Sequence, residues 1–339
     1  MTNSAHRLLI LLAAGALLLL PASGCRSAST TPPTGGHEGI GDEMPPLSPV
    51  NLGEGEKLQV VATTSIVADV VQNVGGELID LTTLMPLGTD PHGFEPTPRD
   101  AAAVADAHAV FVNGSGLEVF LDNLLESAGQ GVTVVPMSYG IELRQFEGGH
   151  DREAREEGEH EHSGGFDPHT WFDPNNVMVW TQNIAHALSA LDPDNAEAYA
   201  ANASAYEAEL RALDAWIREQ LAQVPEGNRQ LITDHTAFSY FAHRYGLEQI
   251  GAVFPGYSTL AEPSAQDLAK LEDTIRALGV KAVFVGLTVN PALAERVADD
   301  TGIRLVFLYT GSLSEPGGPA GDYIAFMRYN VSAIAEALR

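Results

Sequence analysis

The amino-acid sequence predicts an α/β protein of two lobes, each with a mainly parallel sheet, joined by one long connector helix. First, 339 residues are more than one compact core usually holds. Second, short β-branched runs alternate with helix-like stretches, which is typical of parallel sheets. Third, the helical pattern at 192–224 is longer than one lobe needs. The folded chain is therefore expected to comprise an N-terminal lobe at 57–191, the connector helix and a C-terminal lobe at 225–339.

Residues 1–25 have the features of an export signal. The apolar run Leu8–Leu20, 13 residues long, is too short for a membrane span of ~20 residues and suits the core of a signal peptide. The small residues before Cys25 resemble a bacterial lipobox, which implies cleavage before Cys25 and attachment of a membrane-anchoring lipid to its sulfur. The alternative is a secreted protein cut near the same place. Both interpretations put the mature protein outside the cytoplasm, on the periplasmic side or the cell surface.

Residues 26–56 are rich in Ser, Thr, Pro and Gly and show no hydrophobic period, which predicts a flexible tether. Order is expected to begin at Leu58. The expected strands are Leu58–Thr63, Leu78–Leu84, Ala109–Asn113, Val132–Pro136, Arg229–Thr233, Lys281–Val285 and Arg304–Tyr309. The expected helices include Ile66–Val74, Pro98–Ala107, Ala265–Leu278 and Pro291–Thr301.

The connector helix is expected to start with Asp192 as N-cap and Pro193 in the first helical position. From there to Val224 the chain contains neither Gly nor Pro, and apolar side chains recur every three or four residues. Roughly thirty residues at ~1.5 Å each give a rod of about 45 Å, which is long enough to join two lobes. The alternative is a helix that pairs in a coiled-coil dimer, although much of the apolar stripe is alanine.

The charge balance restricts the possible partners. With 45 Asp and Glu against 18 Lys and Arg, the net charge of −27 disfavours a nucleic-acid partner and favours a cation. The single cysteine excludes an intrachain disulfide and a thiolate zinc cluster. Any bound metal ion must therefore be held by His and carboxylate side chains.

Three of the eleven histidines lie in short polar segments at or near expected strand ends: His92, His169 and His235. Loops at the carboxyl ends of parallel strands are where open α/β sheets place their ligands. The triplet Asp-Pro-His occurs twice, ending at His92 and His169, and its proline stiffens the loop around each imidazole. A single histidine is more often structural than a ligand. Two repeated His loops and a third His after a strand together predict a metal site with three imidazole ligands.

An aspartate closely precedes each of these histidines: Asp90, Asp167 and Asp234. Each carboxylate is expected to accept the second imidazole N–H, because this bond fixes the tautomer and raises the basicity of a metal-binding imidazole. The prediction is thus three imidazoles, each oriented by its own carboxylate.

A further group of histidines lies in the polar, Gly-flanked segment 146–165: His150, His160 and His162. We expect this segment to be a mobile loop that collects metal ions without forming the main site. The alternative is a solvated acidic insertion whose histidines are incidental.

Several segments of the chain resemble one known family. They are Val61–Asp69, Asp90–Arg99, Val112–Gly114 with Leu117-Glu118, His235 with Ala237-Phe238 and Tyr240-Phe241, Glu262–Ser264, and Gly321–Tyr323. From about Leu58 to the C-terminus the chain is similar to bacterial ABC-transporter solute-binding lipoproteins for zinc and manganese (solute-binding protein family 9). The resemblance implies a metal ion in a cleft between two lobes and its delivery to an ABC permease and the ATPase of that permease. We expect a monomer that is not an enzyme.

One position departs from the family. In many members an Asp two residues before a Leu supplies a fourth metal ligand, and the resemblance puts Gly311 at that position. Three neutral imidazoles suit Zn²⁺, whereas Mn²⁺ prefers carboxylate and water oxygens. The sequence therefore predicts Zn²⁺ as the transported ion, with Mn²⁺ as the alternative within the family. If Gly311 has a positive φ, an Asp there would also carry a strain cost.

Two functions of other classes stay open at this point. Three histidines and a water also form the metal site of zinc hydrolases, but the sequence has no His-Glu-x-x-His pattern to supply a general base. A surface lipoprotein that acts as an adhesin could use the metal ion for stability alone. Stoichiometric metal binding without substrate turnover would indicate a transport protein. Hydrolysis that stops when the metal is removed would indicate a hydrolase, and unfolding of the core on chelation of the metal would indicate an adhesin.

Overall fold

The computed structural model describes residues 43–129, 131–145 and 165–339. The predicted signal peptide with Cys25, the first part of the predicted tether, and His150, His160 and His162 lie outside the described residues. None of the helices in the described ranges is both long and apolar enough to cross a bilayer.

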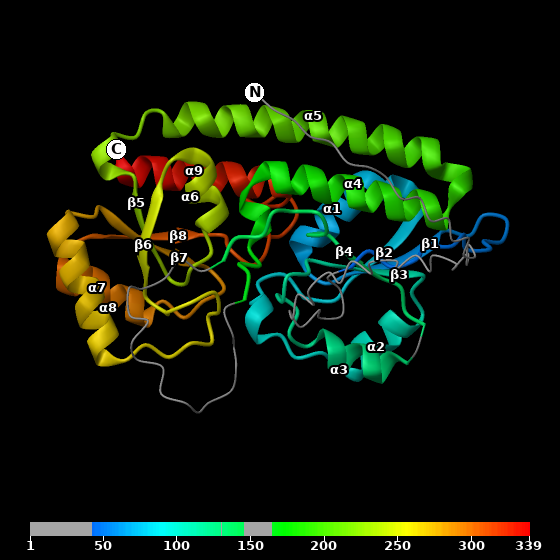
Figure 1. The fold of residues 1–339 in the computed structure, drawn as a ribbon, viewed down its shortest axis with the longest axis horizontal. Helices are drawn as coiled ribbons and strands as arrows, with labels where there is room; N and C mark the ends of the chain where they lie inside the picture. The colour runs from blue at the N-terminus through cyan, green and yellow to red at the C-terminus, as the bar shows by residue number, and fades with distance from the viewer. Residues whose placement is uncertain (1–42, 130, 146–164) are drawn as a thin grey trace, which may run out of the picture. The chain divides into compact units, whose positions relative to one another are not determined.

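The N-terminal lobe contains a four-stranded parallel sheet in the order β2-β1-β3-β4. Its strands are β1 (Leu58–Ala62), β2 (Ile79–Thr83), β3 (Ala109–Val112) and β4 (Val134–Pro136). Its longer helices are α1 (Ser65–Gly75), α2 (Pro98–Ala105), α3 (Leu121–Ala128) and α4 (Pro174–Leu191). Successive side chains of a strand point to opposite faces, so Val60 packs in the core beneath α1 and α4, while Val61 packs in the core beside α2 and α3 (Figure 1). Both faces of the sheet are covered, which explains its apolar strands.

The C-terminal lobe repeats this arrangement, with a parallel sheet in the order β6-β5-β7-β8. Its strands are β5 (Gln230–Thr233), β6 (Glu248–Ala252), β7 (Ala282–Gly286) and β8 (Arg304–Leu308). Its helices are α6 (Ser239–Tyr245), α7 (Ala265–Leu278), α8 (Ala292–Thr301) and α9 (Tyr323–Leu338). Helices α7 and α8 pack on one face of the sheet, and α9 packs on the other (Figure 1). Strand β6 was not among the strands expected from the sequence.

The connector is helix α5 (Ala196–Leu221), about 39 Å long at ~1.5 Å per residue. It contacts α1 and α4 of the N-terminal lobe and α9 of the C-terminal lobe. Its buried residues form the apolar stripe expected from the sequence: Tyr199, Ala203, Tyr206, Leu210, Leu213, Ile217 and Leu221. Since this stripe is buried within the chain, the coiled-coil alternative does not apply.

The start of the connector differs in detail from the expectation. Residues Pro193–Asn195 form a 3₁₀ turn, and the α-helix begins only at Ala196. The Asp192 carboxylate accepts hydrogen bonds from the side chains of Asn195 at 2.7 Å and Tyr199 at 2.8 Å, instead of from a helix N–H. Asp192 therefore anchors the first turn of the helix through side chains.

One hydrophobic core extends through both lobes. Phe172, just before α4, packs against Phe238 after β5, with 4.2 Å between ring centroids, and against Phe326 of α9, at 5.8 Å. Buried aromatic rings at these distances stabilise the fold through their mutual contact, in addition to the apolar area that they bury. The chain on either side of the connector is therefore joined by a shared core.

Residues 43–56 belong to the predicted tether, but in the structure they lie against the folded body. Met44, Leu47, Val50 and Leu52 are partly buried against the main core, and Val50 N donates to Leu191 O at 2.7 Å. These apolar residues are spaced without a helical or strand period, so the sequence pattern did not reveal the packing. The boundaries of the signal peptide, the tether and the lobes stay predictions.

Candidate metal centre

His92 lies in a short 3₁₀ turn, Pro91–Gly93, in the loop after β2. Asp90 caps this turn, because its Oδ1 accepts a hydrogen bond from His92 N at 3.0 Å. The other carboxylate oxygen of Asp90 accepts from Thr259 Oγ1, in the loop between β6 and α7, at 2.6 Å. Asp90 was expected to bond the imidazole ring of His92; it bonds the backbone of His92 and the opposite lobe instead.

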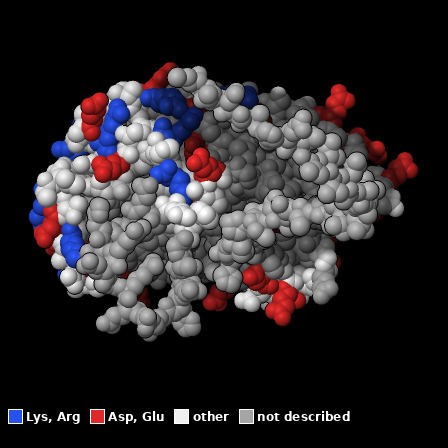
Figure 2. Space-filling view, viewed as in Figure 1, with Lys and Arg blue, Asp and Glu red and all other residues white. Residues whose placement is uncertain are grey.

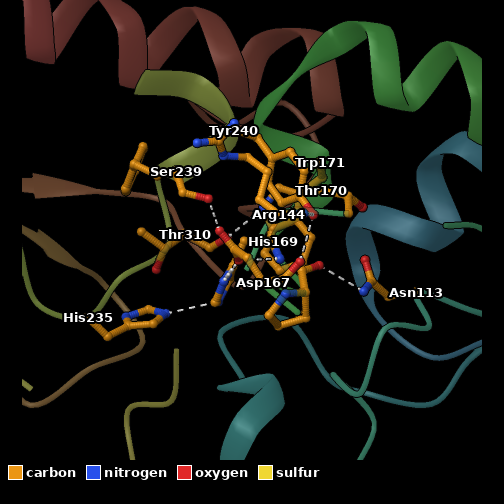
Figure 3. A network of polar contacts seen from close by, with 12 residues as sticks. Asn113, Arg144, Asp167, His169, Thr170, Trp171, His235, Ser239, Tyr240 and Thr310 are labelled. Atoms are coloured by element: carbon orange, nitrogen blue, oxygen red, sulfur yellow. Dashed lines mark hydrogen bonds and ion pairs between the residues drawn. The ribbon is translucent and has the colours of Figure 1, made fainter. Parts of the chain in front are cut away.

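His169 lies before the turn Thr170–Phe172 that leads into α4. Asp167 Oδ1 accepts from His169 N at 2.9 Å and from His169 Nδ1 at 2.7 Å. Ser239 of α6 donates to the other oxygen of Asp167 (Figure 3). The carboxylate that orients His169 is therefore itself held by the C-terminal lobe.

His235 follows β5, and Asp234 holds it in the same way. Asp234 Oδ1 accepts from His235 N at 2.6 Å and from Nδ1 at 2.8 Å, while Oδ2 accepts from Gly286 N at 2.6 Å. Asp167 and Asp234 thus make the imidazole bonds expected of them. When each ring is neutral and donates from Nδ1 to its aspartate, Nε2 of His169 and of His235 carries the lone pair.

The three Nε2 atoms converge on one point. His169 Nε2 lies 3.1 Å from His92 Nε2 and 3.1 Å from His235 Nε2. The exposed fractions of His92, His169 and His235 are 9, 1 and 3%. A zinc ion at ~2.0–2.1 Å from each nitrogen of a tetrahedral site separates these nitrogens by about 3.3 Å. Two of the three nitrogen pairs are therefore close to the spacing that one metal ion requires, and all three ligand atoms lie within 4.8 Å of one another.

Burial and charge set the protonation of this cluster. Burial, together with the charges of His169 and His235, lowers the pKa of His92 well below its ordinary value. Burial and His235 likewise lower the pKa of His169. Burial opposes protonation of His235 as well, but the adjacent Asp234 carboxylate, together with the charges of Asp90 and Asp167, outweighs burial and raises the pKa of His235. Neutral imidazoles are the form that binds metal ions, so at least His92 and His169 are prepared as ligands.

The three imidazoles line a small cavity of about 10 Å³. This leaves room for roughly one ion or one water. The other lining residues are Asp90, Pro91, Trp171, Thr259, Thr288, Thr310 and Gly311. The threonines and Trp171 were not expected from the sequence, since they lie in loops without a distinguishing pattern. The backbone of Gly311 is not in the left-handed region, so the strain considered for an Asp there does not arise.

The charge around the cavity is uneven. Within the described part of the N-terminal lobe, the basic residues are Lys57, Arg99 and Arg144. On the face shown in Figure 2, the Lys and Arg side chains gather mainly over the C-terminal lobe, whereas acidic side chains dominate the opposite end. A surface of this kind raises the local concentration of cations.

Residues 60–337 match the family described as zinc-uptake complex component A, periplasmic. The chain belongs to this family. The chain is 35% identical over 286 residues to the manganese-binding lipoprotein of Halalkalibacterium halodurans, and the alignment covers 84% of this chain and 90% of that one. It is 32% identical over 295 residues to the manganese ABC transporter substrate-binding lipoprotein of Streptococcus mitis, with coverages of 85% and 91%.

Solved structures agree with this assignment. The periplasmic zinc-binding protein of Treponema pallidum aligns with a TM-score of 0.74 and 27% identity, over 84% of this chain and 99% of that one. The Mn-bound periplasmic metal-binding protein of Candidatus Liberibacter asiaticus aligns with a TM-score of 0.71 and 26% identity, over 84% and 100%. The expected fold class, two parallel-sheet lobes with a helical connector, is confirmed.

Family membership also decides the class of function. The protein is the extracytoplasmic substrate-binding component of a metal ABC transporter, whose other components are a permease and an ATPase. It is a transport protein and not an enzyme, so the hydrolase alternative is wrong.

Proposed function

We propose that the binding protein captures one Zn²⁺ ion with His92, His169 and His235 and delivers it to its ABC permease. The observation that carries this proposal is the convergence of three buried Nε2 atoms, two pairs of which are 3.1 Å apart. Ring nitrogens this close need either a shared proton or a metal cation between them. A divalent ion that replaces the shared protons can accept the lone pairs of all three rings.

The donor set favours zinc. All three proposed ligands are imidazole nitrogens, which suit Zn²⁺ better than Mn²⁺. The carboxylates nearest to them, those of Asp90, Asp167 and Asp234, are already engaged by hydrogen bonds. Gly311 adds no oxygen donor where many family members have Asp. Water is then the simplest fourth ligand.

Manganese is the second candidate. The relatives from Halalkalibacterium halodurans and Streptococcus mitis are named for manganese, and the aligned structure from Candidatus Liberibacter asiaticus holds Mn²⁺. Any N/O site binds Zn²⁺ more tightly than Mn²⁺ by the Irving–Williams order, so relative affinity alone does not decide which ion is transported. The metal that co-purifies with the protein is the more direct evidence.

Bonds between the lobes explain how the ion is retained. Thr259 donates to Asp90 at 2.6 Å, and Trp171 Nε1 donates to Thr310 O at 3.2 Å. Both bonds lie beside the cavity, and they exclude water from the ligands. Release to the permease then requires that the lobes separate enough to break them.

Elemental analysis of protein purified without chelators tests the identity of the ion, and we expect about one zinc per chain. The variants His92→Ala, His169→Ala and His235→Ala should each weaken Zn²⁺ binding by orders of magnitude. His243→Ala is the matched control, because His243 is exposed on α6. Small and equal effects from all four variants would overturn the ligand assignment. Co-purified manganese that zinc does not displace would overturn the choice of metal.

The remaining parts of the proposal concern residues outside the cavity. Cys25 is the proposed site of lipid attachment, and His150, His160 and His162 are proposed to collect metal ions near the main site. The protein is proposed to act as a monomer.

A further inference from the structure

The loop after β3 carries two buried polar residues for which the proposed ligand set gives no role. Asn113 and Glu118 are part of the segment that resembles the family, yet neither lines the metal cavity. Their exposed fractions are only 1% and 6%. A buried amide or carboxylate is costly unless its polar atoms are bonded, so the bonds of these two residues indicate what they hold in place.

Glu118 joins the carboxyl ends of β1 and β3. Its Oε1 accepts from Thr63 Oγ1 at 2.7 Å and from Asn113 N at 2.7 Å, and its Oε2 accepts from Gly114 N at 3.1 Å. Residues 114, 115 and 116 have φ of 80°, 55° and 78°, three left-handed conformations in succession. Backbone turns that aim successive N–H groups at one point bind acceptor groups, and here the two oxygens of Glu118 accept from Asn113 N and Gly114 N. The conformation of the loop therefore depends on this carboxylate.

Asn113 extends this structure to the proposed metal ligand. Its Nδ2 donates to Gly114 O at 2.8 Å and to Pro168 O at 2.9 Å (Figure 3). Pro168 immediately precedes His169. On the other side, Ser239 and Tyr240 of the C-terminal lobe bond Asp167, the latter through Asp167 O at 2.9 Å. The loop that carries His169 is therefore held from two sides. Asn113 bonds it to the N-terminal sheet, and Ser239 and Tyr240 bond it to the C-terminal lobe.

We propose that Asn113, held by Glu118, is a positioning residue that sets His169 against His92 in the metal site. The inference rests on the proposed ligand set. His169 is the central imidazole, 3.1 Å from each of the other two, so a shift of its loop changes both nitrogen–nitrogen distances. Loss of partners that orient metal ligands typically costs 10–100-fold in affinity, and we expect an effect in that range.

The test compares Asn113→Ala with Asn183→Ala. Asn183 on α4 is a matched control, because its Nδ2 also donates to two backbone carbonyls of the same lobe, Met137 O at 2.8 Å and Tyr139 O at 2.9 Å, and it does not line the cavity. Three quantities are measured on the full chain: Zn²⁺ affinity, the visible spectrum of the Co²⁺-loaded protein, and the melting temperature without metal. Asn113→Ala should lower Zn²⁺ affinity about tenfold or more and alter the Co²⁺ bands. Asn183→Ala should change only the melting temperature.

Two further variants keep the test decisive if Asn113→Ala does not fold. Glu118→Gln and Thr63→Val each remove part of the bonding of the Glu118 carboxylate, and both should change the affinity and the Co²⁺ spectrum in the same direction. Unchanged affinity and spectrum in the folded variants would overturn the positioning role while leaving the ligand set intact. Failure of the wild-type protein to bind Zn²⁺ or Co²⁺ would overturn the proposed function and this inference together.

Discussion

The ring of Pro91 occupies the space that a side chain at position 311 would enter. A Cβ atom on Gly311 would lie 2.5 Å from Pro91 Cδ and 3.1 Å from Pro91 Cγ. Contacts that close do not occur between packed side chains, so Gly311 permits the loop that carries His92 to approach the loop after β8. The chain can therefore place the Pro91 ring next to position 311 or carry a carboxylate at that position, but not both in this arrangement.

The first prediction concerns Gly311→Ala and Gly311→Asp. Either side chain must displace Pro91, so both variants should lower the melting temperature without metal and weaken Zn²⁺ binding. Asp also brings an oxygen donor, which favours hard cations. Gly311→Asp should therefore recover more affinity for Mn²⁺ than for Zn²⁺ relative to Gly311→Ala, measured by titration of both ions. Identical zinc-to-manganese ratios in the two folded variants would mean that the side chain at 311 does not reach the ion.

The second prediction concerns the bond between Thr259 and Asp90, which are 2.6 Å apart at Thr259 Oγ1 and Asp90 Oδ2. Thr259→Val keeps the shape of the side chain and removes the hydroxyl. A hydrogen bond to a charged group contributes ~1.5–3 kcal/mol, so Zn²⁺ should dissociate about ten- to a hundredfold faster, as measured by stopped-flow transfer to a chelator. Ser258→Ala is the control, because Ser258 Oγ accepts a local hydrogen bond from Leu260 N at 3.2 Å, within the same loop. Equal dissociation rates in the two variants would show that the bond between Thr259 and Asp90 does not slow the release of Zn²⁺.

The third prediction concerns Asp69 on α1, whose Oδ2 accepts from Tyr323 N at the start of α9 at 3.0 Å. Burial raises the pKa of Asp69 to about 6. Because an unfolded Asp titrates near ~3.9, the folded protein binds more protons between these values, and stability declines as the pH rises from about 4 to about 6. Asp69→Asn removes this penalty, at most ~3 kcal/mol, and keeps an oxygen that can accept from Tyr323 N.

The stabilisation of Asp69→Asn should therefore be largest at pH 7.5 and close to zero at pH 4. The measurement is the difference in melting temperature between variant and wild type, both without metal, at each pH. A variant that is less stable than wild type at pH 7.5 and not at pH 4 would show that the charged carboxylate stabilises the start of α9, with the opposite sign to that expected here.

The fourth prediction concerns the His-rich segment. Replacing His150, His160 and His162 together by Asn should remove weak Zn²⁺ binding and leave one tight site, as seen by calorimetric titration. The physical reason is that the three buried imidazoles at 92, 169 and 235 need no donor from this segment. If the tight site disappears, the segment contributes a ligand to the main site.

Much of this architecture could be predicted because it depends on local periodicity. Strand β1 is a short apolar run that is buried on both faces, and the apolar stripe of α5 repeats every three to four residues, so the chain itself marks these buried residues. His92, His169 and His235 could be identified because stiff polar loops next to expected strands carry them. Strand β6 was missed because Glu248–Ala252 is a half-exposed edge strand with polar residues and a glycine.

The sequence by itself predicted the two lobes, the connector, the three histidines and the carboxylate partners of His169 and His235, since all of these follow from short-range patterns along the chain. Only the tertiary structure decided which partner each polar group takes. Asp90 bonds Thr259, which is 169 positions away, and Asn113 bonds Pro168 in another loop. The contact between Pro91 and Gly311 likewise joins the two lobes. Such pairs are decided by how segments that are distant in the sequence pack in three dimensions, which no local pattern records.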